Sequence, residues 1–407
     1  MQDSIKVIGA SKVFVCDEAF SILDNHAIAY NERIIEVGEY RALERKYGNG
    51  VFYEDCVLLP SFINPHIHFE FSKNTTSFLY GGFDRWLGSV IAQRQSVLED
   101  NATALQDAID EQLKSGVGSV GAISSYGGDM EALATSPLKV VYFNEIIGSN
   151  PSAVDFLYSD FLARLESSQA LASSSFIPAI ALHSPYSVHF ILAKKVLEIA
   201  RVQNLPTSVH FLESKHEREW LEHSSGWFAR FFCDTLKLQN PQSLYQIPDF
   251  IKLFEGLDTL FVHCLFATQE ELSALTRHGT IITCPRSNRL LNNTLLDLDL
   301  LPPHKVALAT DGKSSNNNLN FLDELRCALF GYPHKDCVSF SQSLLLSATN
   351  FAAKALRLNN GILAPHYDAD FALFEVAGVK DSAQEALQLL LHAKQARSLC
   401  VSGKTLF

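Results

Sequence analysis

The middle of the chain alternates short apolar runs with amphipathic stretches of helical period. Eight such runs can be read, and most of them end in a polar residue or are closely followed by one. Near-continuous apolar strands that alternate with helices are typical of a parallel sheet covered on both faces. The pattern predicts an α/β fold, a (β/α)8 TIM-like barrel over residues 58–360, with a doubly wound sheet as the alternative. The runs are 58–68, 118–123, 140–143, 177–182, 207–210, 259–263, 280–284 and 306–310.

One of the intervening helices has clear boundary signals. Thr268 and Glu271 have the spacing of a capping box, which predicts that a helix begins there. Gly279 follows the apolar positions of that helix, and we expect it to close the helix.

Both ends of the chain predict short strands instead. Residues 5–57 alternate short apolar runs with turn residues, and a similar pattern returns at 369–376 and 398–404. We expect residues 1–57 and 361–407 to form one small β-sandwich domain beside the barrel.

Composition narrows the class of protein. The 407 residues carry a formal net charge of −12, which disfavours binding to nucleic acid or to an anionic membrane. The eight cysteines are scattered without a Cys-x-x-Cys pair, as expected of reduced thiols in a cytoplasm. The N-terminus lacks a signal-peptide pattern, and no stretch reaches the roughly 18 apolar residues of a membrane span. We therefore expect a soluble, cytoplasmic protein.

Candidate chemistry lies where the apolar runs end, because barrel enzymes carry their active sites at the C-terminal ends of the strands. His66 and His68 are spaced i, i+2, so in a strand they point to the same face and can offer two imidazoles to one metal ion. The alternative for this pair is two polar residues at a strand end. The polar residues that end these runs or follow them within two positions are His66, His68, Glu145, His183, His210, His263 and Asp311.

Four of these residues can complete a metal site. Three nitrogens from His66, His68 and His210 and one carboxylate from Asp311 leave room for water, which is typical of catalytic rather than structural sites. One divalent ion, zinc or iron(II), suits this set of ligands, and it would lower the pKa of a bound water.

Three further residues have candidate roles beside the metal. Glu213 follows His210 by three residues and is a candidate proton shuttle, or alternatively a first-turn carboxylate favoured by the helix dipole. His263 is the candidate for polarising the attacked group, or alternatively a hydrogen-bonded histidine at a strand end. His183 is expected to contact substrate.

Five motifs in this order resemble the amidohydrolase superfamily over essentially the whole chain. The fourth strand ends without a lysine, so the chain resembles the one-metal branch that deaminates purines and pyrimidines. The motifs are Pro60-x-x-x-Asn64-x-His66-x-His68, His210-x-x-Glu213, Val262-His263-Cys264, Cys284-Pro285-x-Ser287-Asn288 and Thr310-Asp311-Gly312-x-x-Ser315-Asn316-Asn317.

Within that branch, segments 78–90, 207–214 and 287–291 look closest to the aminofutalosine deaminases. Those enzymes convert 6-amino-6-deoxyfutalosine to futalosine in menaquinone biosynthesis. His183-Ser184-Pro185-Tyr186 and Trp86 also resemble the deaminases of S-adenosylhomocysteine, methylthioadenosine and adenosine. Such relatives place a glutamate nine residues after the tryptophan to hold ribose hydroxyls, where this chain has Gln95.

The resemblance implies a small nucleoside substrate that contacts His183, Trp86 and Asn288, and a homodimer, since relatives often dimerise. The sequence departs from the family pattern at His366, where a glycine is usual.

The reaction implied is hydrolytic deamination of an adenine-type ring. Asp311 would accept a proton from the attacking water, Glu213 would protonate the ring nitrogen beside C6 and later the departing amine, and His263 would hold the attacking oxygen. The alternatives are a guanine or cytosine deaminase, a triazine hydrolase, an enzyme that cleaves a cyclic amide, and a non-catalytic binding protein.

Overall fold

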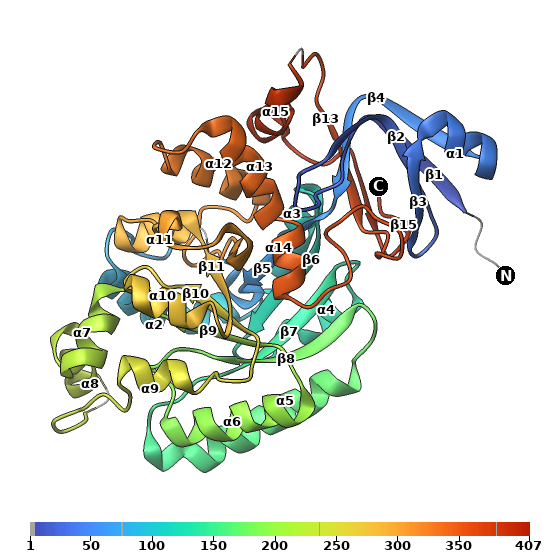
Figure 1. The fold of residues 1–407 in the computed structure, drawn as a ribbon. Helices are drawn as coiled ribbons and strands as arrows, with labels where there is room; N and C mark the ends of the chain where they lie inside the picture. Colours follow the sequence, from blue (N-terminus) through green and yellow to red (C-terminus); the bar gives the residue numbers. More distant parts are fainter. Residues whose placement is uncertain (1–4, 75, 236, 380) are drawn as a thin grey trace.

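The computed structural model describes residues 5–407 apart from residues 75, 236 and 380. Its centre is a sheet of eight strands in the order β12-β11-β10-β9-β8-β7-β6-β5, in which every hydrogen-bonded pair of neighbours is parallel. The sheet curves into a barrel with helices around it (Figure 1). The barrel strands are β5 (Phe62–Ile67), β6 (Val117–Ser124), β7 (Lys139–Ile146), β8 (Phe176–Leu182), β9 (Thr207–Phe211), β10 (Thr259–His263), β11 (Gly279–Thr283) and β12 (Val306–Leu308).

Each of these strands overlaps one of the eight apolar runs, so the predicted barrel is confirmed. Residues 58–60 of the first run, however, end a strand of the second sheet, Gly50–Pro60. Between the first and last strands the described residues form no regular ladder, and a side chain bridges the gap. The amide of Asn64 on β5 accepts from the backbone N–H of Thr310, 3.1 Å away, and donates to the Thr310 hydroxyl, 2.7 Å away. The asparagine of the first motif therefore ties β5 to the segment that follows β12.

The helices of the described chain lie mainly on the outside of the barrel (Figure 1), and none of the described helices is long and apolar enough to cross a membrane. The α-helices are α1 (Tyr40–Tyr47), α2 (Phe83–Leu98), α3 (Ala102–Lys114), α4 (Met130–Thr135), α5 (Val154–Ala170), α6 (Phe190–Gln203), α7 (Lys215–His223), α8 (Gly226–Asp234), α9 (Ile247–Lys252), α10 (Gln269–Leu275), α11 (Pro285–Asn292), α12 (Phe321–Gly331), α13 (Cys337–Ser347), α14 (Asn350–Ala355) and α15 (Glu385–His392). The 3-10 helices are η1 (Phe69–Phe71), η2 (Pro151–Ala153), η3 (Leu298–Leu300), η4 (Pro303–Lys305) and η5 (Ser382–Gln384).

The start of α10 confirms the predicted capping box, with the Thr268 and Glu271 side chains bonded to each other's backbone N–H groups. The expectation for Gly279 is wrong. This glycine is the first residue of β11, where an added Cβ would collide with the backbone of Thr259. Close approach of two strands, and not a helix end, requires glycine at this position.

The second sheet draws strands from both ends of the chain, as predicted. It contains β1 (Lys6–Phe14), β2 (Ile22–Tyr30), β3 (Ile34–Glu39), β4 (Gly50–Pro60), β13 (Phe371–Glu375), β14 (Ser398–Val401) and β15 (Lys404–Thr405) in the order β15-β14-β13-β4-β1-β2-β3. Two strands separate β2 from β13, yet the Tyr30 and Phe371 rings lie 4.9 Å apart. The sheet therefore folds over its own core. His366 beside it has φ 74°, a backbone conformation that explains why a glycine is usual there.

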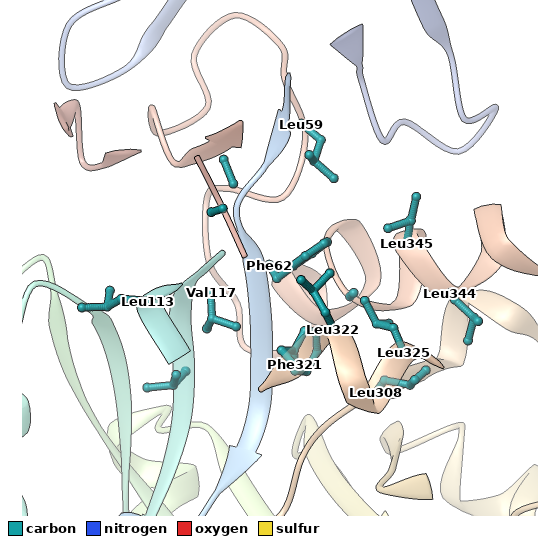
Figure 2. Packing of buried hydrophobic residues seen from close by; sticks show 14 of the residues in the cluster. Leu59, Phe62, Leu113, Val117, Leu308, Phe321, Leu322, Leu325, Leu344 and Leu345 are labelled. Atoms are coloured by element: carbon teal, nitrogen blue, oxygen red, sulfur yellow. The ribbon is translucent and has the colours of Figure 1, made fainter. Parts of the chain in front are cut away.

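The two sheets share a hydrophobic core around Phe62, the first residue of β5. Its ring lies 5.8 Å from the ring of Phe321 on α12 and 5.4 Å from that of Phe374 on β13. Figure 2 shows Phe62 beside Leu322 of α12, with Val117 of β6 across the strand. Burying a phenylalanine contributes about 1.5–3 kcal/mol, so this contact helps to fix the position of β5 and of the histidines at its end.

Candidate active site

The C-terminal ends of the barrel strands open into a pocket of about 480 Å³. The strand-end residues that line it are His68, Glu145, His183, His210, Glu213, His263 and Asp311. These residues form what we call the floor of the pocket. The fully buried His66 lies beside the floor, because its Nε2 is 3.2 Å from the Nε2 atoms of both His68 and His210.

Four donor atoms converge at one point of the floor. The Nε2 atoms of His66, His68 and His210 lie 3.2–3.3 Å from one another, and Asp311 Oδ1 lies 3.5 Å from the Nε2 atoms of His66 and His68. A tetrahedral ion with ligand distances of about 2.0–2.1 Å separates its ligand atoms by about 3.3–3.4 Å. The spacing of these atoms therefore fits a divalent cation.

The protonation states also suit a metal. Burial lowers the pKa of His68 to about 3 and lowers the pKa of His66 and His210 below their ordinary values, so the imidazoles are neutral at neutral pH. His210 Nδ1 lies 2.8 Å from the carbonyl oxygen of His183, to which it donates. This bond leaves the lone pair of His210 on Nε2, the atom that faces the other donors.

Asp311 is held by hydrogen bonds to both carboxylate oxygens. Oδ2 accepts from the hydroxyls of Ser287, at 2.8 Å, and Ser315, at 2.7 Å, and Oδ1 accepts from the N–H of Gly312. Gly312 also has to be small, because an added Cβ would lie 2.9 Å from the Cβ of His68. The carboxylate is thereby fixed with Oδ1 toward the histidines.

Glu213 lies on the same floor with its Oε1 3.6 Å from Nε2 of His263. Burial, reinforced by the charge of Asp311, raises the pKa of Glu213 well above its ordinary value. The buried carboxylate of Glu217 accepts from the backbone N–H groups of Leu212 and Glu213, each at 2.9 Å, and so fixes the segment that carries Glu213. A raised pKa keeps the proton on a carboxyl group to higher pH, which suits a general acid.

His263 is oriented by Asn288. Its Nδ1 lies 2.8 Å from Asn288 Oδ1 and donates to it, so the Nε2 lone pair faces the floor, 3.9 Å from Asp311 Oδ2. The amide of Asn288 also donates to Thr283 Oγ1. We expected Asn288 to contact substrate, but it lies behind His263 and is absent from the pocket lining. Its contacts favour a role in orienting the histidine.

His183 and Trp86 do line the pocket, where a substrate can reach them. His183 Nδ1 lies 2.6 Å from the Ser187 hydroxyl, and Trp86 Nε1 donates to the carbonyl oxygen of Ser314, 2.9 Å away. Gln95 is exposed, outside the pocket lining, and its amide donates to Glu99.

The sequence alone assigned no role to two carboxylates and two hydroxyls of this site. Glu145 lines the pocket, with Oε2 bonded to the Ser125 hydroxyl and Oε1 3.8 Å from His210 Nδ1. Its place at a strand end was the only available signal. Glu217 carried no signal beyond its nearness to Glu213. Ser287 and Ser315 were members of two of the motifs, but no role was assigned to them.

Backbone strain gathers around the same floor. Leu212, His263, Cys264 and Asp311 all have positive φ angles, between 48° and 71°, although none is glycine. Such conformations cost free energy and cluster at functional sites, where the surrounding structure holds them in place. Each of them directs the chain at the end of β9, β10 or β12.

The parallel barrel and the imidazoles and carboxylates at its strand ends place the chain in a class: barrel proteins with a candidate site for a single metal ion. The chain belongs to the amidohydrolase family, whose model matches residues 57–406.

Similar proteins cover nearly the whole chain. Aminodeoxyfutalosine deaminase of a Nitratiruptor species is 40% identical over 94% of this chain and 96% of its own length. Adenosine deaminase of Helicobacter pylori is 42% identical over 98% of this chain and 99% of its own. The crystal structure of Helicobacter pylori aminofutalosine deaminase in complex with methylthio-coformycin matches with a TM-score of 0.95 and 41% identity, over 99% of this chain and 100% of that one.

Proposed function

We propose that the chain is a metal-dependent deaminase of adenine-type nucleosides that converts 6-amino-6-deoxyfutalosine into futalosine and ammonia, a step of menaquinone biosynthesis. The observation that carries the reaction type is the convergence of three neutral imidazoles and Asp311 beside the buried Glu213. The full-length similarity to the aminodeoxyfutalosine deaminase of Nitratiruptor supports the choice of substrate.

One divalent metal ion, zinc or iron(II), fits the donor set of His66, His68, His210 and Asp311. When bound, such an ion lowers the pKa of water and so provides a nucleophile near neutral pH. The remaining chemistry belongs to the side chains of the floor.

The proton transfers follow from the positions of Asp311, Glu213 and His263. Asp311 accepts a proton from the attacking water while the oxygen of that water bonds to C6 of the purine. Glu213 donates a proton to N1, so that the ring accepts the electron pair, and His263 Nε2 accepts a hydrogen bond from the attacking oxygen. Asp311 then passes the proton that it took from water to the amine, the C6–N bond breaks and ammonia leaves. The last proton of the attacking oxygen, now the carbonyl oxygen at C6, returns to Glu213.

Adenosine is the second candidate substrate, because the relative from Helicobacter pylori is named an adenosine deaminase. Ammonia release from 6-amino-6-deoxyfutalosine, adenosine and methylthioadenosine, compared as kcat/KM, separates the candidates. We expect the highest kcat/KM for 6-amino-6-deoxyfutalosine. A higher value for either of the other two nucleosides would reject the proposed substrate. Absence of ammonia release from all three would reject the proposed deaminase activity.

The metal site has its own test. His66→Ala and His210→Ala each remove one of the converging nitrogens, so we expect purified variants to contain far less metal by elemental analysis, with ammonia release lost. His223→Ala is the matched control, because His223 is an exposed histidine away from the pocket. Full metal content in either His66→Ala or His210→Ala would contradict the proposed ligands.

A further inference from the structure

One wall of the pocket is a single face of helix α2. The residues of this helix that line the pocket are Trp86, Leu87, Val90, Ile91 and Arg94. They recur at intervals of three and four, as residues on one face of a helix do. Trp86 is bonded to the loop that follows Asp311, and Arg94 lies eight residues further on, about 12 Å along the helix axis. The wall therefore leads away from the floor and ends in a cation.

Among the described residues that line the pocket, Arg94 is the only lysine or arginine. Its guanidinium carbon lies 6.0 Å from the centre of the Tyr126 ring, and Nη1 lies 3.4 Å from the Tyr126 hydroxyl. No carboxylate of the described chain approaches the Arg94 guanidinium within 4.0 Å. An exposed arginine is often only solvated, but this one has a pocket in front of it and an aromatic partner beside it.

The loop that carries Tyr126 is held in position. The buried carboxylate of Glu70 accepts from the backbone N–H groups of Ser125, Tyr126 and Gly128, at 2.8–3.1 Å. These bonds occupy both carboxylate oxygens of Glu70 with backbone donors. The guanidinium of Arg94 and the hydroxyl of Tyr126 are thus presented together at the outer end of the pocket.

We propose that Arg94, together with Tyr126, binds a carboxylate on the outer end of the nucleoside substrate. The inference rests on the proposed function, because that function puts C6 of the purine beside Glu213 and Asp311. The ribose and its 5′ substituent then extend outward along α2. In 6-amino-6-deoxyfutalosine the 5′ substituent is a ketone that ends in a carboxyphenyl ring.

From the floor outward, the side chains of the wall change from apolar to cationic, as the substituent changes from an aromatic ring to a carboxylate. Val90 and Ile91 offer an apolar surface to the ring, and Arg94 lies beyond them, where the carboxylate would be. A guanidinium binds a carboxylate through two parallel N–H bonds, which a neutral nucleoside cannot accept in the same way. Arg94 is therefore a specificity-determining residue, which favours substrates with an acidic 5′ end over adenosine and methylthioadenosine.

The experiment compares 6-amino-6-deoxyfutalosine with its neutral carboxamide analogue in the metal-loaded enzyme. The readout is the ratio of kcat/KM for the acid to kcat/KM for the amide. For the unaltered chain we expect a ratio well above one that falls as salt is added. In Arg94→Ala the ratio falls about tenfold, as expected for the loss of one ion pair at a partly solvated position. Arg94→Lys restores part of it.

Arg85→Ala is the matched control, because Arg85 is an exposed arginine on the same helix outside the pocket lining, and its loss changes the net charge equally. We expect it to keep the ratio. If the unaltered enzyme favours the acid and Arg94→Ala keeps that preference, the role of Arg94 is wrong while the proposed function stands. If the unaltered enzyme does not deaminate 6-amino-6-deoxyfutalosine, the proposed substrate fails first, and this inference fails with it.

Discussion

The floor and the outer wall of the pocket are built in different ways. On the floor, Asp311 accepts three hydrogen bonds, His263 is oriented by Asn288, and the backbone of Glu213 is fixed by Glu217. On the outer wall, apolar side chains of α2 line the pocket, and the Arg94 guanidinium is bonded to the Tyr126 hydroxyl alone among the described side chains. Hydrogen bonds between polar groups fix the side chains of the floor. The composition of the wall depends instead on which face of helix α2 is turned toward the pocket.

This difference separates chemistry from selectivity. Proton transfer requires donors and acceptors in narrow geometries, so the floor has a second residue behind each reacting group. Binding the far end of a substrate requires mainly shape and one charge, which few residues can supply. Substitutions on the floor should therefore reduce turnover for every substrate, whereas substitutions on the wall should change the ranking of substrates.

Among substitutions that leave the metal ligands in place, the largest effect is expected for Glu213→Gln. The amide keeps the size of the side chain but cannot donate and recover a proton, so kcat should fall by about 10²- to 10⁴-fold. Metal content should be unchanged, because Glu213 is not among the converging donors. Rates of ammonia release and elemental analysis check both parts, with the exposed Glu270→Gln as the control. Near-normal turnover would remove Glu213 from the mechanism.

Ser287→Ala and Ser315→Ala test the groups behind Asp311. Each variant removes one hydrogen bond to Oδ2 and frees the carboxylate to rotate, so metal affinity should fall about 10- to 100-fold. Competition with a chelator measures this affinity, and Ser273→Ala on the exposed face of α10 is the control. An unchanged affinity in both variants would mean that Asp311 is held without the serines.

The sequence predicts the floor better than the wall for a physical reason. His66, His68, His210 and Asp311 lie at the ends of parallel strands, and the barrel brings strand ends together whatever the loops do. The structure brings these four residues together as their spacing predicted.

The remaining groups depend on features that spacing does not encode. Asn288 was expected at the substrate and lies behind His263, because the direction of α11 decides which way its side chain points. Arg94 gave no sequence signal, since the face of α2 that meets the pocket depends on tertiary packing.

Trp86→Phe tests the junction between floor and wall. The phenylalanine keeps an aromatic ring but loses the hydrogen bond from Nε1 to Ser314, which is worth about 1 kcal/mol. We expect KM for 6-amino-6-deoxyfutalosine to rise about fivefold, with kcat nearly constant, since α2 is less firmly attached to the loop after Asp311. Steady-state kinetics measure the two constants. A fall in kcat with constant KM would place Trp86 in the chemistry and not at the junction.

Gln95→Glu should have the smallest effect, although it restores the glutamate that related deaminases place nine residues after the tryptophan. Here that position is exposed, and its side chain is bonded to Glu99 one turn along α2. A second carboxylate at i, i+4 should cost about 0.2–0.5 kcal/mol of stability and leave kcat/KM for methylthioadenosine and S-adenosylhomocysteine unchanged. Gln93→Glu, which alters another exposed glutamine of the same helix, is the control for added charge.

A several-fold rise in kcat/KM for Gln95→Glu alone would mean that position 95 reaches the ribose. Helix α2 would then have to turn by about one residue, or 100°, and Arg94 would leave the pocket. The weakest substitution in the series therefore tests the rotation of the helix on which the whole outer wall depends.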